Sequence, residues 1–471
     1  MARLLSGIVF ANPGQQGDMM TRILSASTAL FILLAASAHA DEKQFPAKLA
    51  GQAILPANTI IAAPADAPDF LKTSGKFTTP DRKRTDALGT VPGKDGARVT
   101  DLKLPFDGQP IQGFSGIKAM PDGTFWTLSD NGFGSKQNSS DAMLFLHQLK
   151  FDWDNGKVDV VKNLFLSDPN KKAPFPIVLE GSGKRYLTGS DFDIESIQPV
   201  ADGFWLGDEF GPYLLKFDTN GQLTDVFATT VDGKPVMSPD NALLQLPGNP
   251  TQKMPAFNLK RSGGFEGLAL SKDGSKLYGL LEGAIYKDDG QMESVDGHTA
   301  IRVIEFDVAS KGWTGRSWLY PFADKGVSIG DFNMLDETTA LVIERDNGAG
   351  TKDKACADPK QPKPDCFEAP AELKRVYKIE FSDANVGKSV RKIGYIDLLR
   401  IEDPDHKRRQ GGGEGFYDMP FVTIENVDRV DATHIIIGND NNLPFSAGRA
   451  VDKADDNEFS ILEVGDFLNA K

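Results

Sequence analysis

The stretch Phe265-Glu266-Gly267-Leu268-Ala269, followed after a turn by Leu280-Leu281-Glu282-Gly283, contains the pattern that decides the fold of this chain. A short hydrophobic segment holds a small or acidic residue, and a second hydrophobic segment then runs into acidic or amide residues. Strand pairs that recur every ~65–90 residues, with no helical units between them, are typical of β-propeller blades. The sequence therefore predicts an all-β propeller. The pattern occurs five times, in the ranges 113–132, 194–211, 265–283, 330–347 and 424–441.

The number of blades depends on the segments that flank these five copies. A lead-in strand is expected near Ala97 to Leu104, and the C-terminal stretch Phe459 to Val464 reads as a further strand. Together they favour six blades, the last closed by strands from both termini. Five or seven blades remain alternatives, because the sixth blade is inferred only from the flanking strands that do not repeat the pattern.

The first 40 residues have the features of a signal peptide. Arg22 precedes the apolar run Ile23 to Ala36, which ends at Ala38-His39-Ala40, and this order matches a charged region, a hydrophobic region and a cleavage signal. Residues 1–18 are expected to lie upstream of the true start, and a buried N-terminal helix is the alternative interpretation. We therefore predict export, with the periplasm as destination. One propeller domain is expected over residues 41–471, with no membrane span.

Composition and charge limit the classes of partner. The 471 residues include 66 Asp and Glu against 52 Lys and Arg, for a formal net charge of −14. Such a chain does not attract nucleic acid through its overall field, although it can attract cations. We expect a monomer that acts on a small molecule.

The two cysteines, Cys356 and Cys366, flank a segment rich in Pro, Lys and Asp. In an exported protein this arrangement predicts a disulfide that closes a surface loop. A cysteine-based zinc site is not expected, because the chain has no C-x-x-C motif.

Acidic residues recur at the same points of the repeat and should converge on the propeller axis. Glu195, Glu266 and Glu425 take matching places in three of the strands expected to line this axis. Carboxylates that converge without matching cations repel one another, and Ca²⁺ or Mg²⁺ would relieve that repulsion. We expect calcium; a turn-forming role is the alternative for the aspartates at strand ends. The predicted metal ligands are Glu195, Asp208, Glu266, Glu282, Glu344, Glu425 and Asp440.

Basic residues accompany these acids and indicate an anionic substrate. Lys260 and Arg261 shortly precede Glu266, and Arg345 and Lys184 also lie near acidic residues. Arginine binds phosphate oxygens with two parallel hydrogen bonds. For each basic residue alone, a solvated surface charge or an ion pair between blades is the alternative. We predict substrate binding by Lys260, Arg261, Arg345 and Lys184, and catalysis by Glu266, Asp208, Glu209, Arg261 and Arg345.

Three groups of motifs carry a resemblance to a known family: Gly113–Ile117 with Thr127–Gly132, Asp193–Ser196 with Gly207–Pro212, and Gly264–Ala269. Together they resemble the phytase-like domain family, described as "esterase-like activity of phytase", over roughly residues 110–445. The resemblance implies an exported β-propeller, common in Gram-negative bacteria, with a phosphatase-type or esterase-type activity. The alkaline propeller phytases, which are similar in outline, use several calcium ions.

Three functions follow from these features. The first is an exported, calcium-dependent hydrolase of phosphate or carboxylate esters, acting on a small, anionic ester. The second is a lactonase of the calcium-propeller type, which needs one central metal and an apolar pocket instead of basic residues. The third is a non-catalytic binding propeller in which the acids are structural.

Overall fold

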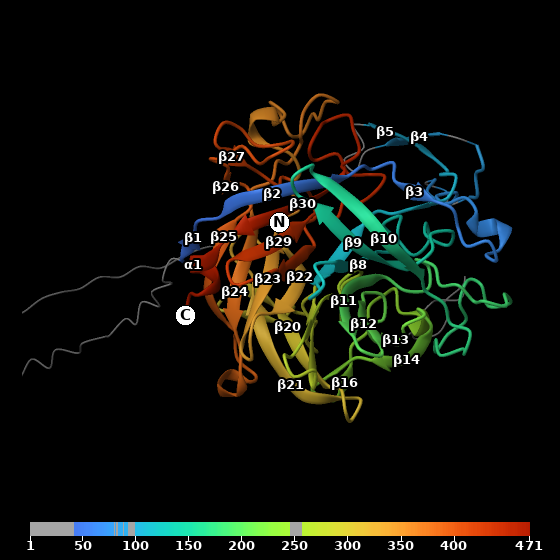
Figure 1. The fold of residues 1–471 in the computed structure, drawn as a ribbon. Coiled ribbons are helices and arrows are strands. Elements are labelled where there is room, and N and C mark those ends of the chain that lie inside the picture. The colour runs from blue at the N-terminus through green and yellow to red at the C-terminus, as the bar shows by residue number, and fades with distance from the viewer. Residues whose placement is uncertain (1–41, 80, 82, 88, 93–98, 245–256) are drawn as a thin grey trace, which may run out of the picture. The chain divides into compact units, whose positions relative to one another are not determined.

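Antiparallel pairing between strands adjacent in sequence builds most of the structure (Figure 1). The computed structural model describes residues 42–471 apart from 80, 82, 88, 93–98 and 245–256, so the expected signal peptide lies outside the described residues. The helical segments described are 3-10 turns and one short helix, and the all-β prediction is confirmed. No helix in the described part is long and apolar enough to cross a membrane.

The strands group into blades of four, and the innermost strands of successive blades contact one another in a closed ring. The last blade takes its fourth strand from the N-terminal end of the described residues (Figure 1). There, β2 pairs antiparallel with β30 from Lys48↔Glu463 to Leu55↔Asn457. Closure by strands from both ends is therefore confirmed. The blades, from inside outward, are β7 (Phe114–Ala119), β8 (Phe125–Ser129), β9 (Phe145–Asp152) and β10 (Lys157–Phe165); β11 (Ile194–Val200), β12 (Gly203–Asp208), β13 (Tyr213–Phe217) and β14 (Leu223–Ala228); β17 (Phe265–Leu270), β18 (Lys276–Leu281), β20 (His298–Asp307) and β21 (Gly312–Pro321); β22 (Ser328–Met334), β23 (Thr339–Arg345), β24 (Lys374–Glu380) and β25 (Arg391–Asp397); β28 (Asn426–Arg429), β29 (His434–Gly438), β30 (Asn457–Glu463) and β2 (Lys48–Leu55).

The described strands make five such blades, not the six that the sequence favoured. The expected lead-in strand exists as β5 (Val99–Leu104), but it pairs with β4 (Gly89–Pro92) in a separate two-stranded sheet. The chain before β7 therefore supplies the outer strand β2 and small two-stranded sheets instead of a sixth blade. The remaining elements are β1 (Gln44–Phe45), β3 (Ile60–Ile61), β6 (Gln109–Pro110), β15 (Thr230–Val231), β16 (Lys234–Pro235), β19 (Ser294–Val295), β26 (Ile401–Glu402), β27 (Phe416–Tyr417), the 3-10 turns Asp69–Leu71, Ala242–Leu244, Lys352–Lys354 and Asp383–Asn385, and α1 (Gly465–Leu468).

The hydrophobic core lies between the faces of neighbouring blades. The Trp126 and Phe204 rings, on β8 and β12, meet edge to face with centroids 4.9 Å apart. Ile435, Ile436 and Ile437 are all fully buried on β29, because both faces of that blade are covered. Burial of one such side chain contributes about 1.5–3 kcal/mol. The packed blades thus provide a rigid frame for the residues at the axis.

Irregular pairing in the inner strands positions the axial side chains. The ladder between β11 and β12 shifts register around Glu195, and the ladder between β17 and β18 shifts around Glu266. A β-bulge inserts one residue into a strand and re-aims its side chain, often beside functional sites. Both glutamates therefore leave the regular alternation at the start of their strands.

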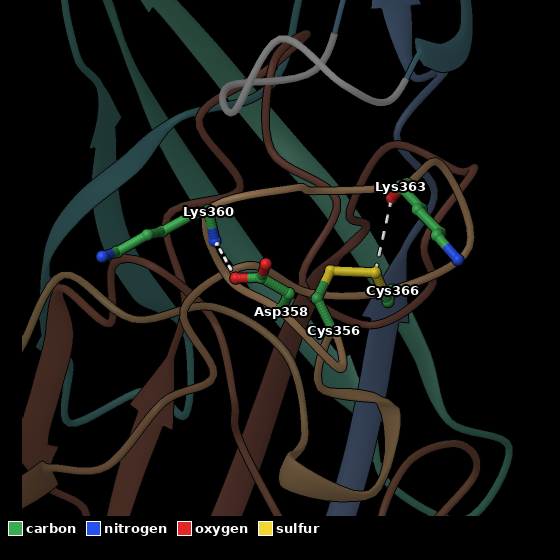
Figure 2. The surroundings of a disulfide bond; sticks show 5 residues. All are labelled: Cys356, Asp358, Lys360, Lys363 and Cys366. Atoms are coloured by element: carbon green, nitrogen blue, oxygen red, sulfur yellow. Dashed lines mark hydrogen bonds between the residues drawn. A yellow bond between two sulfur atoms is a disulfide. The ribbon is translucent and has the colours of Figure 1, made fainter.

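Cys356 and Cys366 form the predicted disulfide, with Cα atoms 4.9 Å apart. Figure 2 shows the bond across the loop between β23 and β24, where the Lys360 amide donates to Asp358 Oδ1 at 2.9 Å. The Cys356 amide also donates to the Phe367 carbonyl at 2.8 Å. The bond therefore closes a short excursion from the blade, as predicted.

Candidate metal centre at the propeller axis

Glutamates from three blades meet at the start of the inner strands. Glu195 and Glu266 are the second residues of β11 and β17, and Glu425 directly precedes β28. One carboxylate oxygen from each of the three lies within 4.8 Å of the others. We call Glu195, Glu266 and Glu425 the first acid group; the sequence predicted all three as ligands.

A second acid group shares one of these residues. Asp193, Glu195 and Glu209 also offer carboxylate oxygens that lie within 4.8 Å of one another. Asp193 stands just before β11, and Glu209 follows the end of β12, so one hairpin supplies the whole second acid group. Its two ends are tied by the Glu209 amide, which donates to the Asp193 carbonyl at 2.8 Å.

Two of these carboxylates have an oxygen without a protein partner. Glu266 and Glu209 are only 4% and 5% exposed. The Oε1 atom of each is buried and accepts no hydrogen bond from the described residues. Leaving a buried polar atom unpaired is costly, and in native proteins such an atom usually has a water or an ion as its partner.

Two cations enter the cluster but do not balance its charge. Arg345 Nη2 lies 3.3 Å from Glu425 Oε1 and 3.4 Å from Glu282 Oε1. Lys260 Nζ lies 2.8 Å from Glu282 Oε2. Glu282 is thus neutralised by protein cations, whereas the carboxylates of the second acid group have no salt bridge in the described structure.

The electrostatic state of the acids follows from these contacts. Burial raises the pKa of Glu195 and of Glu266 well above the ordinary value, and neighbouring carboxylates add to the rise. Burial likewise raises the pKa of Glu425 to about 8 and that of Asp193 to about 6. Burial alone would also raise the pKa of Glu282, but Lys260 and Arg345 bring it below its ordinary value.

The donor set fits a hard divalent cation. Clustered carboxylate oxygens are the ligands that Ca²⁺ and Mg²⁺ prefer, and soft nitrogen or sulfur ligands are missing from both acid groups. The unpartnered oxygens of Glu209 and Glu266 supply the structural reason for an ion.

Polar side chains fill the axis beyond the first acid group. Asp331 Oδ2 accepts the amides of Ile117 and Val427 at 3.1 and 3.0 Å, from the inner strands of two other blades. Further along the same strands, Lys118 Nζ lies 3.1 Å from Asp428 Oδ1. These bonds give partners to backbone amides and side chains of the inner strands. The acid groups lie at the end of the axis where the inner strands begin.

Two predicted acids are held by backbone amides. Asp208 Oδ1 accepts the amide of Asp193 at 2.9 Å, and Oδ2 accepts that of Gly211 at 2.7 Å. Asp440 Oδ1 accepts the amide of Asn442 at 2.6 Å. The first contact shapes the turn that presents Glu209. Both contacts suit the turn-forming alternative, and the role of the two aspartates as metal ligands stays a prediction.

Three other predicted residues are not brought to the acid groups. Glu344 instead accepts Tyr320 Oη at 2.6 Å and Lys392 Nζ at 2.8 Å. Lys184 is 64% exposed and pairs with Asp66 at 3.5 Å. Arg261 is 56% exposed and pairs with Asp240.

Sequence reasoning missed several residues around the site. Asp193 lies two residues before Glu195, the position that recurs in several blades. Comparing the repeats therefore does not identify it. Asp240 and Lys136 lie in loops outside the repeat, and Lys136 Nζ donates to the Asp240 carbonyl at 3.2 Å. A lone lysine in a Gly/Ser-rich loop gives no pattern that could have identified it.

A Ser–His–Asn chain of hydrogen bonds crosses the first blade but is enclosed. Ser129 Oγ lies 2.9 Å from His147 Nε2, and His147 Nδ1 lies 2.7 Å from Asn163 Oδ1. Burial lowers the pKa of His147 to about 4, so the ring is neutral at pH 7. The cavity beside Ser129 has a volume of about 10 Å³, which suits one water but not an ester.

Comparison with protein families matches most of the chain. A family model described as phytase-like, "Esterase-like activity of phytase", matches residues 109–443. An uncharacterized secreted protein of Arthroderma benhamiae is 31% identical over 137 residues, which span 27% of this chain and 26% of that protein.

Two solved structures resemble the chain at low TM-scores. The native arabinanase of Bacillus subtilis has a TM-score of 0.32 at 12% identity, covering 80% of this chain and 97% of its own. The PQQ-bound aldose sugar dehydrogenase of Streptomyces coelicolor has a TM-score of 0.27 at 12% identity, covering 89% and 99%. The propeller assignment rests on the strand pairing described above.

Proposed function

Because the chain belongs to the phytase-like family, we propose that it is an exported, calcium-dependent hydrolase of phosphate or carboxylate esters. Its substrate would be a small, anionic ester. In this proposal residues 1–40 are a signal peptide, residues 41–471 are one propeller domain and the periplasm is the destination. The secreted relative and the disulfide are compatible with export.

The observation that carries the proposal is the pair of unpartnered oxygens in the acid groups. Glu209 Oε1 and Glu266 Oε1 are buried beside other carboxylates whose charges are not balanced by protein cations. Calcium bound at the acid groups would give these oxygens a partner and offset the repulsion between the acids. Glu195 belongs to both acid groups, so it would contribute a ligand to an ion held by either of them.

Each residue near the axis would then have a distinct role. The metal ligands would be Asp193, Glu195, Glu209, Glu266 and Glu425. Calcium would supply a Lewis acid that polarises the ester. Arg345 would hold Glu425 in place and offer its buried Nε atom, which has no partner in the described residues, to a substrate oxygen.

The alternatives differ in measurable ways. A calcium-propeller lactonase would open lactones and show no preference for anionic esters. A non-catalytic binding propeller would be inactive and indifferent to metal. The enclosed Ser129–His147 pair favours neither, because an ester cannot reach it.

A substrate panel separates these functions. Purified mature protein would be assayed with p-nitrophenyl phosphate, bis-p-nitrophenyl phosphate, p-nitrophenyl acetate and γ-butyrolactone, in excess Ca²⁺ and in EGTA. We expect Ca²⁺-dependent release of p-nitrophenol that Glu266→Gln abolishes and that Glu380→Gln, a change at the partly exposed end of β24, retains. Turnover that is equal in EGTA, or activity confined to the lactone, would contradict the proposal.

A further inference from the structure

Asn131 joins the first blade to the second acid group. It lies in the turn after β8, and its Nδ2 atom donates to Asp193 Oδ1 at 2.9 Å. Asp193 stands just before β11, the inner strand of the next blade. Because Asn131 is only 6% exposed, water competes little for this bond. A side chain of one blade thus holds a carboxylate that another blade supplies.

The side-chain amide of Asn131 fits in one orientation. Its Oδ1 atom accepts the backbone amide of Phe133 at 3.1 Å. Turning the side-chain amide over would place Nδ2 against this N–H group and Oδ1 against the Asp193 carboxylate, so donor would face donor and acceptor would face acceptor. The turn that contains Asn131 therefore directs its donor at Asp193.

The backbone around Asn131 is also fixed. The Gly132 amide donates to Asp130 Oδ1 at 2.7 Å, and Gly132 has a φ of 87°, which favours glycine. Gly189 lies on the segment that leads to Asp193, and a Cβ atom added there would overlap the Asn131 carbonyl oxygen. The segments that carry the donor and the acceptor are therefore in close contact through their backbones.

A neutral donor suits a carboxylate that binds a cation. Glu282 is paired with Lys260 and Arg345, which offset its charge. Asn131 instead orients the Asp193 carboxylate through an uncharged amide, so the negative charge stays available to an ion. Partners that orient the ligands of a metal in this way typically contribute about 10–100-fold in metal affinity.

We propose that Asn131 is a positioning residue, which holds the Asp193 carboxylate toward a divalent cation at the second acid group. The affinity of this site would then depend on a contact between two blades. The inference rests on the calcium site of the proposed function and adds a residue to it. It predicts that Asn131 acts on the ion only through Asp193.

A double-mutant cycle on calcium binding tests this inference. Isothermal titration with CaCl₂ would compare the metal-free mature protein with Asn131→Ala, Asp193→Ala and the double variant. We expect about tenfold weaker binding for Asn131→Ala. In the Asp193→Ala background the same substitution should change Kd by less than about twofold, because no carboxylate remains to be held.

Two further variants guard against a merely structural effect. Asn163→Ala is the matched control, because it removes a side-chain hydrogen bond to His147 between the outer strands of the same blade. It should bind calcium as the wild type does. Asn131→Ser keeps an oxygen for the Phe133 amide, as serine forms similar turns, but its shorter side chain lacks the amide that reaches Asp193. It should weaken binding as Asn131→Ala does, and melting in EGTA identifies any variant that fails to fold.

Terbium luminescence gives a readout that a structural role alone would not move. Tb³⁺ takes the oxygen ligands of calcium sites, and its lifetimes in H₂O and D₂O report the water bound to the ion. An ion that loses the Asp193 carboxylate takes water in its place. We expect more bound water in Asn131→Ala and Asn131→Ser than in wild type and Asn163→Ala. This measurement decides the question if Asp193→Ala alone removes measurable calcium binding.

The outcomes separate this inference from the proposed function. Wild-type calcium affinity in both Asn131 variants, or an equal loss with and without the Asp193 carboxylate, would overturn the inference. Ester hydrolysis that depends on calcium would leave the proposed function standing in either case. Calcium binding that depends on Asn131 in a protein that hydrolyses no ester would refute the proposed function and leave the inference standing. No calcium binding by the wild type would overturn the inference together with the calcium dependence of the proposed function.

Discussion

Arg345 and Glu425 form a buried ion pair at the propeller axis, with Nη2 3.3 Å from Oε1. The same nitrogen lies 3.4 Å from Glu282 Oε1. Arg345 ends β23, whereas Glu425 precedes β28 and Glu282 follows β18, so the guanidinium links three blades. The link places an attractive contact where carboxylates would otherwise repel one another.

Removing this arginine should destabilise the fold. Arg345→Met leaves the buried Glu425 without its cation, whereas Glu282 keeps Lys260; loss of one partner of a buried pair costs about 3–5 kcal/mol. Urea unfolding of the metal-free protein measures the change. Arg391→Met is the control, since Arg391 pairs with Glu380 on the surface and such pairs contribute about 0–1 kcal/mol. Equal losses in the two variants would show that the axial pair does not hold the blades.

The disulfide should matter locally. Closing a short loop contributes at most about 2–3 kcal/mol in the chain-entropy model, and the Cys356–Cys366 loop lies outside the blade strands. We expect the Cys356→Ser/Cys366→Ser double variant to keep its activity and nearly its Tm, while proteolysis within residues 347–372 becomes faster. Mass spectrometry of non-reduced peptides checks the bond, and two free thiols in protein purified without reductant would contradict it.

The repeat predicted the blades and the three glutamates of the first acid group, because both follow from positions that recur. It failed at Glu344, since neighbouring residues of a strand point to opposite faces. Arg345 therefore reaches the axis and Glu344 turns to Tyr320 and Lys392. Arg261, which shortly precedes Glu266, pairs with Asp240, and its role in substrate binding stays a prediction.

The blade count shows a second limit of sequence reasoning. The N-terminal strand β2 completes the blade of β28, β29 and β30, so one blade draws on segments about four hundred residues apart. The sequence predicted closure by both termini but not that β2 supplies the strand, because this segment does not repeat the pattern of the blades. The sequence therefore assigns the strand expected near Ala97 to Leu104 to a separate blade.

Calcium should stabilise the wild type through the acid groups. A ligand that binds only the folded state adds about 2.7 kcal/mol at a concentration of 100 Kd, so Tm should rise with Ca²⁺ and fall again in EGTA. Glu266→Gln keeps the size of the side chain but removes a charge, and should weaken calcium binding at least about tenfold, because affinity follows the charge of the ligand set. Calorimetric titration measures the affinity. Glu380→Gln, on the surface, should behave as wild type, and an unchanged Tm in wild type with and without Ca²⁺ would argue against the site.

The stability of the metal-free protein should fall as pH rises. Burial raises the pKa of Glu425 to about 8. It also raises the pKa values of Glu195, Glu209 and Glu266 well above the ordinary value for glutamate. A carboxyl group whose pKa is raised by folding stabilises the folded state below its unfolded pKa, about 4.3 for Glu, and loses that contribution as pH rises toward its folded pKa.

Between pH 6 and 8 one such group would cost on the order of 2 kcal/mol. Calcium should offset the loss, because it binds the deprotonated carboxylates and releases their protons. Tm should therefore be compared at pH 6 and 8, in EGTA and in Ca²⁺. We expect a fall with pH in EGTA, and a stabilisation by calcium that is larger at pH 8 than at pH 6. Glu266→Gln removes one of the titrating groups and should reduce both effects, whereas Glu380→Gln should leave them unchanged. A calcium effect of the same size at both pH values would mean that the ion does not bind the buried carboxylates.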